Sequence, residues 1–497
     1  MGLKNWLIKI GILKEKQVPP APPKTNKPTI LQREPTRDEL ALGYAHVGED
    51  DNGNPLWKLK GVPQSHRSTH LYVVGSSGSG KTRFLETLVR QDIANGEGFG
   101  VIDLHGDLTE DLKGYLFLEA KEGDDFLRER VVLIDPSDPD NTVCFNPLER
   151  IDGMDTDAVA GEVVEVFKKI WSEAWGDRLN DLLTSTLIAL IENNLTLAEL
   201  PRFLTDASFR DMVLSNVKHP LCLEYFERYN RRAERTRDEW TESTLNKVRA
   251  FLTNTKLRQM LSSPKSSFSF RDVMDNKKIL LVKLDRGRLK GSADLLGSLL
   301  LAKIQMAAFS RTDTPESERA PFYLYIDEFQ NFATESFLQT LAQSRKYSLP
   351  LILAHQNLAQ LSPSLRASIL TNCKLQAYFN ISRDDANILA KESLSSIYND
   401  PPGWEWYIQQ LQGLLPRICI VKNKVEGGVA KIITPEMPLP HETAEVDAQL
   451  FTQLVANADI GGAYLRSRKE VDEEYESRRA TISNSAEEHS YKERRRS

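Results

Sequence analysis

The sequence predicts an α/β protein with a mostly parallel central sheet and an inserted all-α domain. The first observation behind this prediction is a series of short, almost wholly apolar runs that alternate with helical patterns. Such runs are typical of parallel strands that helices bury on both faces. They occupy residues 71–74, 99–102, 131–134, 279–282, 322–326, 351–354, 375–379 and 418–421.

The second observation is an interruption of this alternation. Between Pro147 and about Asp275, apolar residues recur at helical spacing and β-branched runs are missing. We therefore expect an all-helical domain inserted into the sheet. The predicted division comprises an amphipathic N-terminal segment with a proline-rich linker (1–28), a first core part (29–150), the insert (151–273), a second core part (274–440) and a charged tail (441–497).

The N-terminal segment opens with an apolar stretch, residues 6–13, which Lys9 interrupts. It is too short for a membrane span and lacks the features of a secretory signal. A docking or interfacial anchor and a short helix packed on its own domain both fit it. No run approaches the roughly 20 apolar residues that cross a bilayer, so we expect no transmembrane segment and a cytoplasmic location, with recruitment to a membrane complex left open.

Composition narrows the class of protein only a little. The length of 497 residues predicts more than one domain. A net charge of -6 argues against a uniformly basic nucleic-acid coat, although it leaves room for a basic groove or pore. The cysteines are far apart and form no CxxC pair, which argues against a zinc site or a disulfide framework and fits a reducing cytosol. They are Cys144, Cys222, Cys373 and Cys419.

A phosphate-binding loop is the most specific motif. It lies between the apolar run at 71–74 and a helical pattern that starts at Arg83. Its glycines let backbone amides turn inward around a phosphate, and the helix N-terminus adds partial positive charge. Lys81 should reach the β- and γ-phosphates, and the Thr82 hydroxyl should hold Mg²⁺. We expect ATP and Mg²⁺ to be bound by Gly75, Ser76, Ser77, Gly78, Ser79, Gly80, Lys81 and Thr82.

A pair of acids after the run at 322–326 completes the predicted ATPase site. Asp327 should orient Mg²⁺, and Glu328 should polarise the attacking water. Two acids at a strand end are common on exposed surfaces. Their combination with a phosphate-binding loop favours the catalytic interpretation.

A family resemblance follows from the order of several short motifs. The loop precedes residues 101–108 (VIDLHGDL) and 145–148 (FNPL), and later come 327–332 (DEFQNF), 344–346 (SRK) and 353–356 (LAHQ). In this order they resemble the FtsK/HerA superfamily of ring-forming motor ATPases, above all the coupling proteins of type IV secretion (TraG/TraD type) and soluble HerA-like ATPases. The resemblance covers roughly residues 40–440. In the insert, residues 175–178 and 246–247 also resemble short motifs of the family. It implies a RecA-like P-loop NTPase core.

The resemblance also implies two further roles. Gln356 matches the polar sensor that bonds to the γ-phosphate or the attacking water, as against a glutamine that merely satisfies a strand end. Arg345 matches an arginine presented to a neighbouring subunit's nucleotide, as against one of a solvated surface pair. Such an arginine neutralises transition-state charge.

The remaining polar residues near strand ends are assigned as follows. Asp103, His105 and Asp107 form either a metal site or a loop beside the nucleotide; the loop is favoured, and no zinc is expected. We expect His70 to be a strand-edge residue and Asp135 to be structural.

DNA contact is implied mainly by the resemblance. Arg286, Arg288 and Lys290 form a basic turn that is suited to sequence-independent backbone contact. An arginine-rich stretch at 228–237 nearly balances its charge with acids, so a solvated helix face is favoured there. The tail beyond about Tyr464 is densely charged, and we expect it to fray or to dock on a partner.

Two functions from different classes fit these observations. One is a homo-oligomeric, ATP-driven DNA translocase, expected from the resemblance to be a hexamer, that passes duplex or single-stranded DNA through a ring pore. It would work in conjugation or in a HerA-like complex, with a relaxase, a nuclease or a secretion channel as partner. The other is an ATPase that moves or remodels a protein partner without DNA as substrate.

Overall fold

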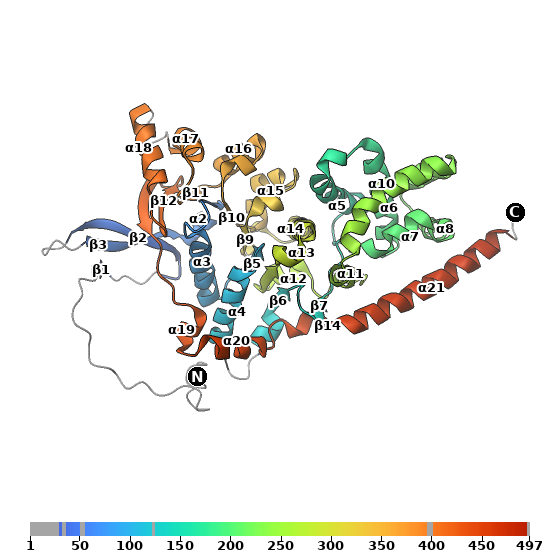
Figure 1. The fold of residues 1–497 in the computed structure, drawn as a ribbon, viewed down its shortest axis with the longest axis horizontal. Coiled ribbons are helices and arrows are strands. Elements are labelled where there is room, and N and C mark those ends of the chain that lie inside the picture. Colours follow the sequence, from blue (N-terminus) through green and yellow to red (C-terminus); the bar gives the residue numbers. More distant parts are fainter. Residues whose placement is uncertain (1–28, 32–35, 50–54, 122–124, 395–400, 495–497) are drawn as a thin grey trace.

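The computed structural model describes residues 29–31, 36–49, 55–121, 125–394 and 401–494. The segment expected at residues 1–28 lies outside this range. The central element is a twelve-stranded sheet with helices on both faces (Figure 1). Its strand order is β1-β3-β2-β13-β12-β11-β4-β10-β9-β5-β8-β6.

Seven adjacent strands of the sheet are all parallel. Each coincides with one of the apolar runs. Successive side chains of a strand point to opposite faces of the sheet, and helices cover both faces, so nearly every side chain is buried. The predicted α/β fold with a mostly parallel sheet is confirmed. In spatial order the strands are β11 (Leu375–Tyr378), β4 (Leu71–Val74), β10 (Leu351–His355), β9 (Phe322–Asp327), β5 (Gly98–Asp103), β8 (Ile279–Lys283) and β6 (Val131–Ile134).

Beyond β11, the sheet continues into a mostly antiparallel extension. The predicted run at 418–421 is part of its first strand, which pairs antiparallel with β11. The other strands of the extension are not among the runs found in the sequence, because polar residues such as Lys58 and Lys60 interrupt them. The extension comprises β12 (Ile418–Asn423), β13 (Gly428–Ile433), β2 (Glu39–Glu49), β3 (Pro55–Pro63) and β1 (Thr29–Leu31).

Side chains of the parallel strands alternate between two hydrophobic clusters. In β4, Leu71 and Val73 belong to one cluster, and Tyr72 and Val74 belong to the other. Helices that contribute to the first cluster include α3 (Lys81–Asn95), α4 (Asp107–Glu119) and α20 (Ala448–Ala456). Those of the second include α14 (Gly291–Phe309), α15 (Phe337–Gln343), α16 (Pro363–Asn372), α17 (Arg383–Glu392) and α18 (Pro401–Gln412).

The insert between β7 (Asn141–Val143) and β8 is helical, as the sequence predicts. It forms a lobe beside the sheet (Figure 1). Its helices are α5 (Thr156–Ile170), α6 (Asp177–Glu192), α7 (Leu200–Thr205), α8 (Ala207–Leu214), α9 (Pro220–Asn230), α10 (Glu234–Leu252), α11 (Thr255–Leu261) and α12 (Phe270–Asp275).

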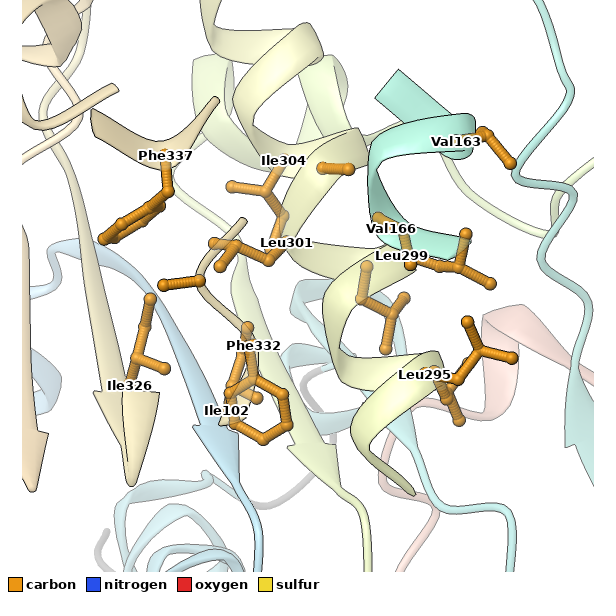
Figure 2. Close-up of a cluster of buried hydrophobic side chains, with 14 of the residues drawn as sticks. Ile102, Val163, Val166, Leu295, Leu299, Leu301, Ile304, Ile326, Phe332 and Phe337 are labelled. Atoms are coloured by element: carbon orange, nitrogen blue, oxygen red, sulfur yellow. The ribbon is translucent and has the colours of Figure 1, made fainter. Parts of the chain in front are cut away.

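The insert shares its hydrophobic core with one face of the sheet. Figure 2 shows Leu295 and Leu299 of α14 next to Val166 of α5, while Ile102 of β5 and Ile326 of β9 lie on the sheet side. All of these residues belong to one continuous buried cluster. Packing is therefore continuous from the sheet through α14 into the insert, and force applied to either region reaches the other through close-packed side chains.

Helix α14 owes its apolar character to this central position. The helical stretch Gly291–Asp313 is the one described segment with the length and hydropathy of a membrane span, and 83% of its most apolar window is buried inside the protein. The apolar runs considered in the sequence did not include this segment. Its burial between sheet and insert accounts for its composition, because a helix that is hydrophobic all round belongs in a core.

The C-terminal segment packs on its own chain. Strand β14 (Leu465–Ser467) pairs with β7, and helix α21 (Arg468–Arg494) follows it. Arg468 donates to the carbonyl oxygens of Pro136, Asp138 and Lys256, and Arg478 forms a 2.7 Å ion pair with Glu199 of the insert. The tail was expected to fray or to dock on a partner. Its first turns instead connect the insert to the sheet, because these arginines satisfy carbonyl groups from distant parts of the chain.

Candidate functional site

The strand register collects the predicted site at one edge of the sheet. Val74 at the end of β4 pairs with His355 of β10, and Ala354 of β10 pairs with Asp327 of β9. The phosphate-binding loop, Gln356 and the acid pair therefore emerge from three adjacent parallel strands at their carboxyl ends. Ligands bind at this edge in open α/β sheets, because the loops there leave a crevice.

The loop is held open by glycine conformations and by two contacts from distant segments. Gly78 and Gly80 have φ values of +74° and +107°, which side chains rarely adopt. The Ser76 amide donates to the Asn380 carbonyl over 2.7 Å, and the Arg417 amide donates to the Ser79 carbonyl over 2.8 Å. The loop is thus bonded to the segment that follows β11 and to the residue that precedes β12, and α3 begins directly after it at Lys81.

Lys81 is folded back over its own loop. Its side chain is 6% exposed, and Nζ donates to the carbonyl oxygens of Gly75 and Ser76 over 2.6 and 3.2 Å. Burial lowers the pKa of Lys81, against the opposing attraction of Asp327 and Glu328. The two carbonyl oxygens are the acceptors that phosphate oxygens would replace.

The acid pair is buried beside this lysine. Asp327 accepts the backbone amide of Glu328 over 3.0 Å, and both side chains are 6% exposed. Burial, followed by repulsion from Glu328 and Asp103, raises the pKa of Asp327 to about 7. Glu328 has a φ of 51°, and its carboxylate accepts the side-chain amide of Gln330 over 2.8 Å. A positive φ is uncommon for a residue with a side chain, so the backbone at Glu328 is strained.

One cavity of about 310 Å³ unites these groups. Its polar lining fits a magnesium nucleotide: a lysine donor, hydroxyl and carboxylate oxygens of the kind that Mg²⁺ prefers, and a loop whose glycines leave room for phosphate. The Ser79 hydroxyl, within the loop, is buried without a hydrogen-bond partner among the described residues. The lining residues are Ser77, Gly78, Gly80, Lys81, Thr82, Arg83, His105, Asp327, Glu328 and Gln356.

Arg345 lies at the opposite edge of the sheet. It follows α15 and precedes β10, whose carboxyl end carries Gln356. The neighbouring Ser344 hydroxyl contacts His70 Nε2 at 3.4 Å, immediately before the start of β4. A five-residue strand spans roughly 16 Å, so Arg345 is separated from its own chain's cavity by the length of the sheet. Arg345 is exposed and forms no ion pair within the described residues.

The ambiguous residues near strand ends have structural partners. Asp103 accepts the backbone amides of Gly106 and Thr109 over 2.9 and 2.8 Å, so it fixes the start of α4, while His105 lines the cavity. These contacts agree with the loop that the sequence favours over a metal site, and its place beside a nucleotide stays a prediction. His70 is 3% exposed and accepts the Leu351 amide over 3.0 Å.

The basic turn is partly neutralised within the chain. It forms α13 (Arg286–Leu289), in which Arg286 pairs with Asp294 over 3.2 Å and Arg288 pairs with Asp285 over 3.1 Å. Two of its three cations therefore have carboxylate partners, which reduces the charge available to a phosphate backbone.

Sequence reasoning missed Asn380 and Arg417 as neighbours of the loop. Gly80 shows how close the second one lies, because a Cβ on Gly80 would be 3.0 Å from the Arg417 backbone nitrogen. Arg417 has a φ of 70°, and its guanidinium donates to the Thr434 carbonyl over 3.0 Å. No local pattern marks either residue, since both contacts join segments more than 300 residues apart in sequence.

Three solved structures share this architecture. The unbound bacterial conjugative coupling protein TrwB matches with a TM-score of 0.53 at 18% identity, covering 79% of this chain and 89% of that one. TrwB in complex with ADP and Mg²⁺ matches with 0.53 at 17%, covering 82% and 98%. VirB4 of Thermoanaerobacter pseudethanolicus matches with 0.50 at 12%, covering 80% and 98%. At these identities the likeness shows the fold alone.

No curated protein matches the sequence. The family model of the type IV secretion-system coupling protein DNA-binding domain does match, over residues 58–391. This range includes the phosphate-binding loop, the insert, the acid pair and Arg345, and it is more than half of the chain. The resemblance inferred from the motifs is confirmed, and the protein belongs to the family of type IV secretion-system coupling protein DNA-binding domains.

Proposed function

We propose that this protein is an ATP-driven, ring-forming DNA translocase. The observation that carries the proposal is that the predicted catalytic residues lie at two opposite edges of the sheet. Lys81, both acids and Gln356 line one cavity, whereas Arg345 is exposed at the far edge. Among the described residues, the one arginine that lines the cavity, Arg83, is paired with Glu86 and Asp111. A site whose own arginine is held by acids, with an arginine unpaired within the described residues at the far edge, is the arrangement expected when turnover needs a neighbouring subunit.

The grouping of these residues in one cavity supports the roles that we propose for them. Lys81 exchanges two backbone carbonyls for phosphate oxygens, and the amides at the start of α3 donate to the same phosphates. Mg²⁺, when bound by Thr82 and Asp327, neutralises charge on the phosphates. Glu328 accepts a proton from the attacking water, and Gln356 orients that water or the γ-phosphate.

The proposed assembly is a closed homo-oligomeric ring, expected to be a hexamer. Head-to-tail contacts that close would bring the amino edge of one subunit against the carboxyl edge of the next. Arg345 would then neutralise transition-state charge at the neighbour's nucleotide. Its lack of an ion-pair partner within the described residues supports this use, because no acid of its own chain holds the guanidinium in place.

DNA is the proposed substrate because the matched family is described by its DNA-binding domain. Contact would be sequence-independent and would involve the pore-facing basic turn at Arg286–Leu289, together with Lys290. All four cysteines are buried and free, which fits work in the reducing cytoplasm. Conjugative transfer with a relaxase and a secretion channel as partners is the proposed setting.

The experiment that tests this proposal is the ATPase rate of the full chain without nucleic acid, with duplex DNA and with single-stranded DNA. We expect DNA to raise the rate and binding to weaken steeply with salt, because phosphate contacts release condensed counterions. Lys81→Ala, which removes a phosphate ligand, should abolish both the basal and the stimulated rate.

One result would favour the second candidate function, an ATPase that remodels a protein partner. It is an active, Lys81-dependent ATPase whose rate ignores both kinds of DNA and which binds neither at low salt. Pairing of Arg286 and Arg288 with acids is the observation that favours this candidate, since it reduces the free positive charge on the basic turn.

A further inference from the structure

The segment that follows β9 joins the proposed general base, Glu328, to the insert. This linking segment comprises residues 328–336 and ends where α15 begins. Two of its side chains, Phe329 and Phe332, are fully buried, and Phe332 lies between the sheet and α14 (Figure 2). Buried rings in a close-packed core have little freedom to move. The polar groups of the linking segment are therefore held at fixed places in the fold.

Gln330 holds the carboxylate of Glu328. Its Nε2 atom donates to Glu328 Oε2 over 2.8 Å. Only the amide nitrogen can face this carboxylate, because two acceptor oxygens would repel each other. The Glu328 backbone is fixed separately, since its carbonyl oxygen accepts the Asn331 side-chain amide over 2.9 Å. With the backbone held, the direction of the carboxylate depends on Gln330.

The Gln330 side chain makes this contact at a cost in stability. Its amide oxygen is buried without a hydrogen-bond partner among the described residues. A buried acceptor without a donor destabilises the folded state, so the needs of folding do not account for this orientation of the amide. The contact with Glu328 does account for it.

The insert holds Gln330 from the other side. Lys169, in the last turn of α5, donates from Nζ to the Gln330 carbonyl oxygen over 3.0 Å. Burial lowers the pKa of Lys169 to about 7, although the charge of Asp294 opposes the shift. Lys168, the next residue, is instead 40% exposed and pairs with Glu165 over 3.3 Å. A lysine of the insert thus fixes the backbone of the residue that orients Glu328.

A second contact joins α5 to the same segment. Ser336, the last residue of the linking segment, donates from its hydroxyl to Glu162 over 3.0 Å. Helix α5 therefore contacts the segment at two points, and it also packs on α14 through Val166 (Figure 2). A displacement of the insert relative to the sheet has to move Gln330 or break its bond with Lys169.

We propose that Gln330 and Lys169 are positioning residues for Glu328, and that the insert controls the activation of water through them. The inference rests on the proposed ATPase function and adds a regulation of that site. A general base acts only within hydrogen-bond reach of the attacking water. A small displacement of Gln330 therefore slows hydrolysis and leaves nucleotide binding unchanged. A partner that displaces the insert would change turnover from a distance.

The test compares ATP hydrolysis by assembled, full-length variants. Gln330→Met keeps the length of the side chain and removes the donor, so it should lower kcat roughly 10- to 100-fold. Lys169→Met should lower kcat in the same way, by at least about threefold. For both variants, KM and the Kd of a non-hydrolysable ATP analogue should stay within about twofold of wild type.

Two matched controls make the same chemical changes outside the network. Lys168→Met, one residue from Lys169, and Gln339→Met, at an exposed position of α15, should keep kcat within about twofold of wild type. The acids that pair with Lys168, Glu165 and Glu335, lie on the exposed side of the segment. Circular dichroism melting checks that each variant is folded.

The Glu328→Gln background separates positioning from a structural role. Both residues are proposed to act through the Glu328 carboxylate, so adding Gln330→Met or Lys169→Met to Glu328→Gln should lower the residual single-turnover rate no further. A general loss of packing would lower the rate by the same factor in both backgrounds, because it does not depend on that carboxylate.

Three outcomes would overturn the inference. An unchanged kcat in Lys169→Met would remove the insert from the control of Glu328. A higher kcat in Gln330→Met would make Gln330 a restraint on the base. Losses that recur in full in the Glu328→Gln background would give both residues a structural role only. A wild-type chain that hydrolyses no ATP, or rapid hydrolysis by Glu328→Gln itself, would instead refute the proposed function and this inference with it.

Discussion

The two edges of the parallel sheet differ in how completely their polar groups are satisfied. At the carboxyl edge, Lys81 and the acid pair are buried together, and each has partners within the chain. At the amino edge, the backbone around Ser344 is fixed by a buried histidine, but Arg345 beside it is exposed and has no ion-pair partner within the described residues. One edge is prepared to hold a ligand, and the other presents a charge outward.

This difference explains why one chain would be an incomplete enzyme. A guanidinium positioned by rigid backbone but unpaired loses little when it moves into a neighbour's site, since no existing ion pair has to break. The carboxyl edge, in contrast, benefits when its groups are already in place, because its charges act in a poorly solvated cavity. The following predictions test whether the edges are as separate as their geometry indicates.

The largest effect is expected for Arg345→Ala. Loss of a trans-acting arginine should lower turnover about 10³- to 10⁵-fold while nucleotide affinity stays close to that of the wild type. Lys346→Ala is the matched control, an exposed cation at the same edge without the guanidinium fork, and it should change turnover far less. The measurement is kcat at saturating ATP, at a protein concentration at which sedimentation shows assembled rings.

A mixing experiment decides which subunit uses the arginine. Arg345→Ala and Lys81→Ala subunits, each nearly inactive alone, should regain activity when mixed before assembly. In such rings an Arg345→Ala subunit keeps Lys81 and receives Arg345 from its neighbour. Mixed rings that remain as inactive as their parents would assign Arg345 to its own subunit or to no catalytic role, and the edges would not cooperate across an interface.

A smaller but still large loss is expected for Glu328→Gln at the carboxyl edge. Removal of a general base should lower kcat about 10²- to 10⁴-fold and leave nucleotide binding intact, so that ATP accumulates on the protein. Glu335→Gln makes the same charge change at a side chain that is 83% exposed, and it should be close to wild type. Rapid hydrolysis by the Glu328→Gln protein would show that another group activates water.

Much of this carboxyl edge follows from the sequence. A glycine-rich loop bounded by a strand and a helix, and two acids after an apolar run, are local signals, and strands covered on both faces bury nearly every side chain. The parallel order of the strands then places Asp327 and Gln356 beside Lys81 without further information. The assignment of catalytic roles to these residues stays a prediction.

The remainder depends on contacts between distant segments. The strands at 39–49 and 55–63 contain polar residues, so they do not appear in the sequence as apolar runs. The dipeptide Asn52-Gly53 between them is nevertheless a known hairpin signal. The docking of α21 rests on Arg468 and Arg478, which read in the sequence as ordinary charges of a polar tail. The ion pair between Arg288 and Asp285 could not be predicted from the sequence, because either side chain could have faced solvent alone. It became visible only with the structure of α13.

The close packing around the phosphate-binding loop provides a further prediction. A Cβ added at Gly75 would be 2.5 Å from Phe379 Cβ and 2.7 Å from Ser79 Oγ, so Gly75→Ala must displace the loop. We expect about 1–3 kcal/mol of lost nucleotide binding, or roughly a 5- to 150-fold higher Kd. Gly161→Ala in α5 has no atom within 4 Å of its new Cβ and should leave Kd unchanged. Unaltered affinity in Gly75→Ala would mean that the loop relaxes freely.

The smallest effect concerns the backbone that carries Arg345, and it depends on pH. Burial, reinforced by the charge of Arg345, lowers the pKa of His70 to about 4, although a backbone hydrogen bond opposes the shift. In the locally open state the ring would titrate with a pKa near 6.5. The open state therefore binds more protons between these two values, and stability against opening is lost as pH falls from about 6.5 to about 4.

Hydrogen exchange of the Leu351 amide, which donates to His70 Nδ1, measures this opening directly. From pH 7 to pH 5, after correction for intrinsic exchange, protection should fall by about 2 kcal/mol, or roughly 30-fold. His70→Asn is the informative variant, since asparagine tolerates the φ of 62° at this position and offers an acceptor that does not titrate. Its protection should be nearly independent of pH. An equal fall in both proteins would place the titrating group elsewhere and would leave Arg345 on a backbone that His70 does not control.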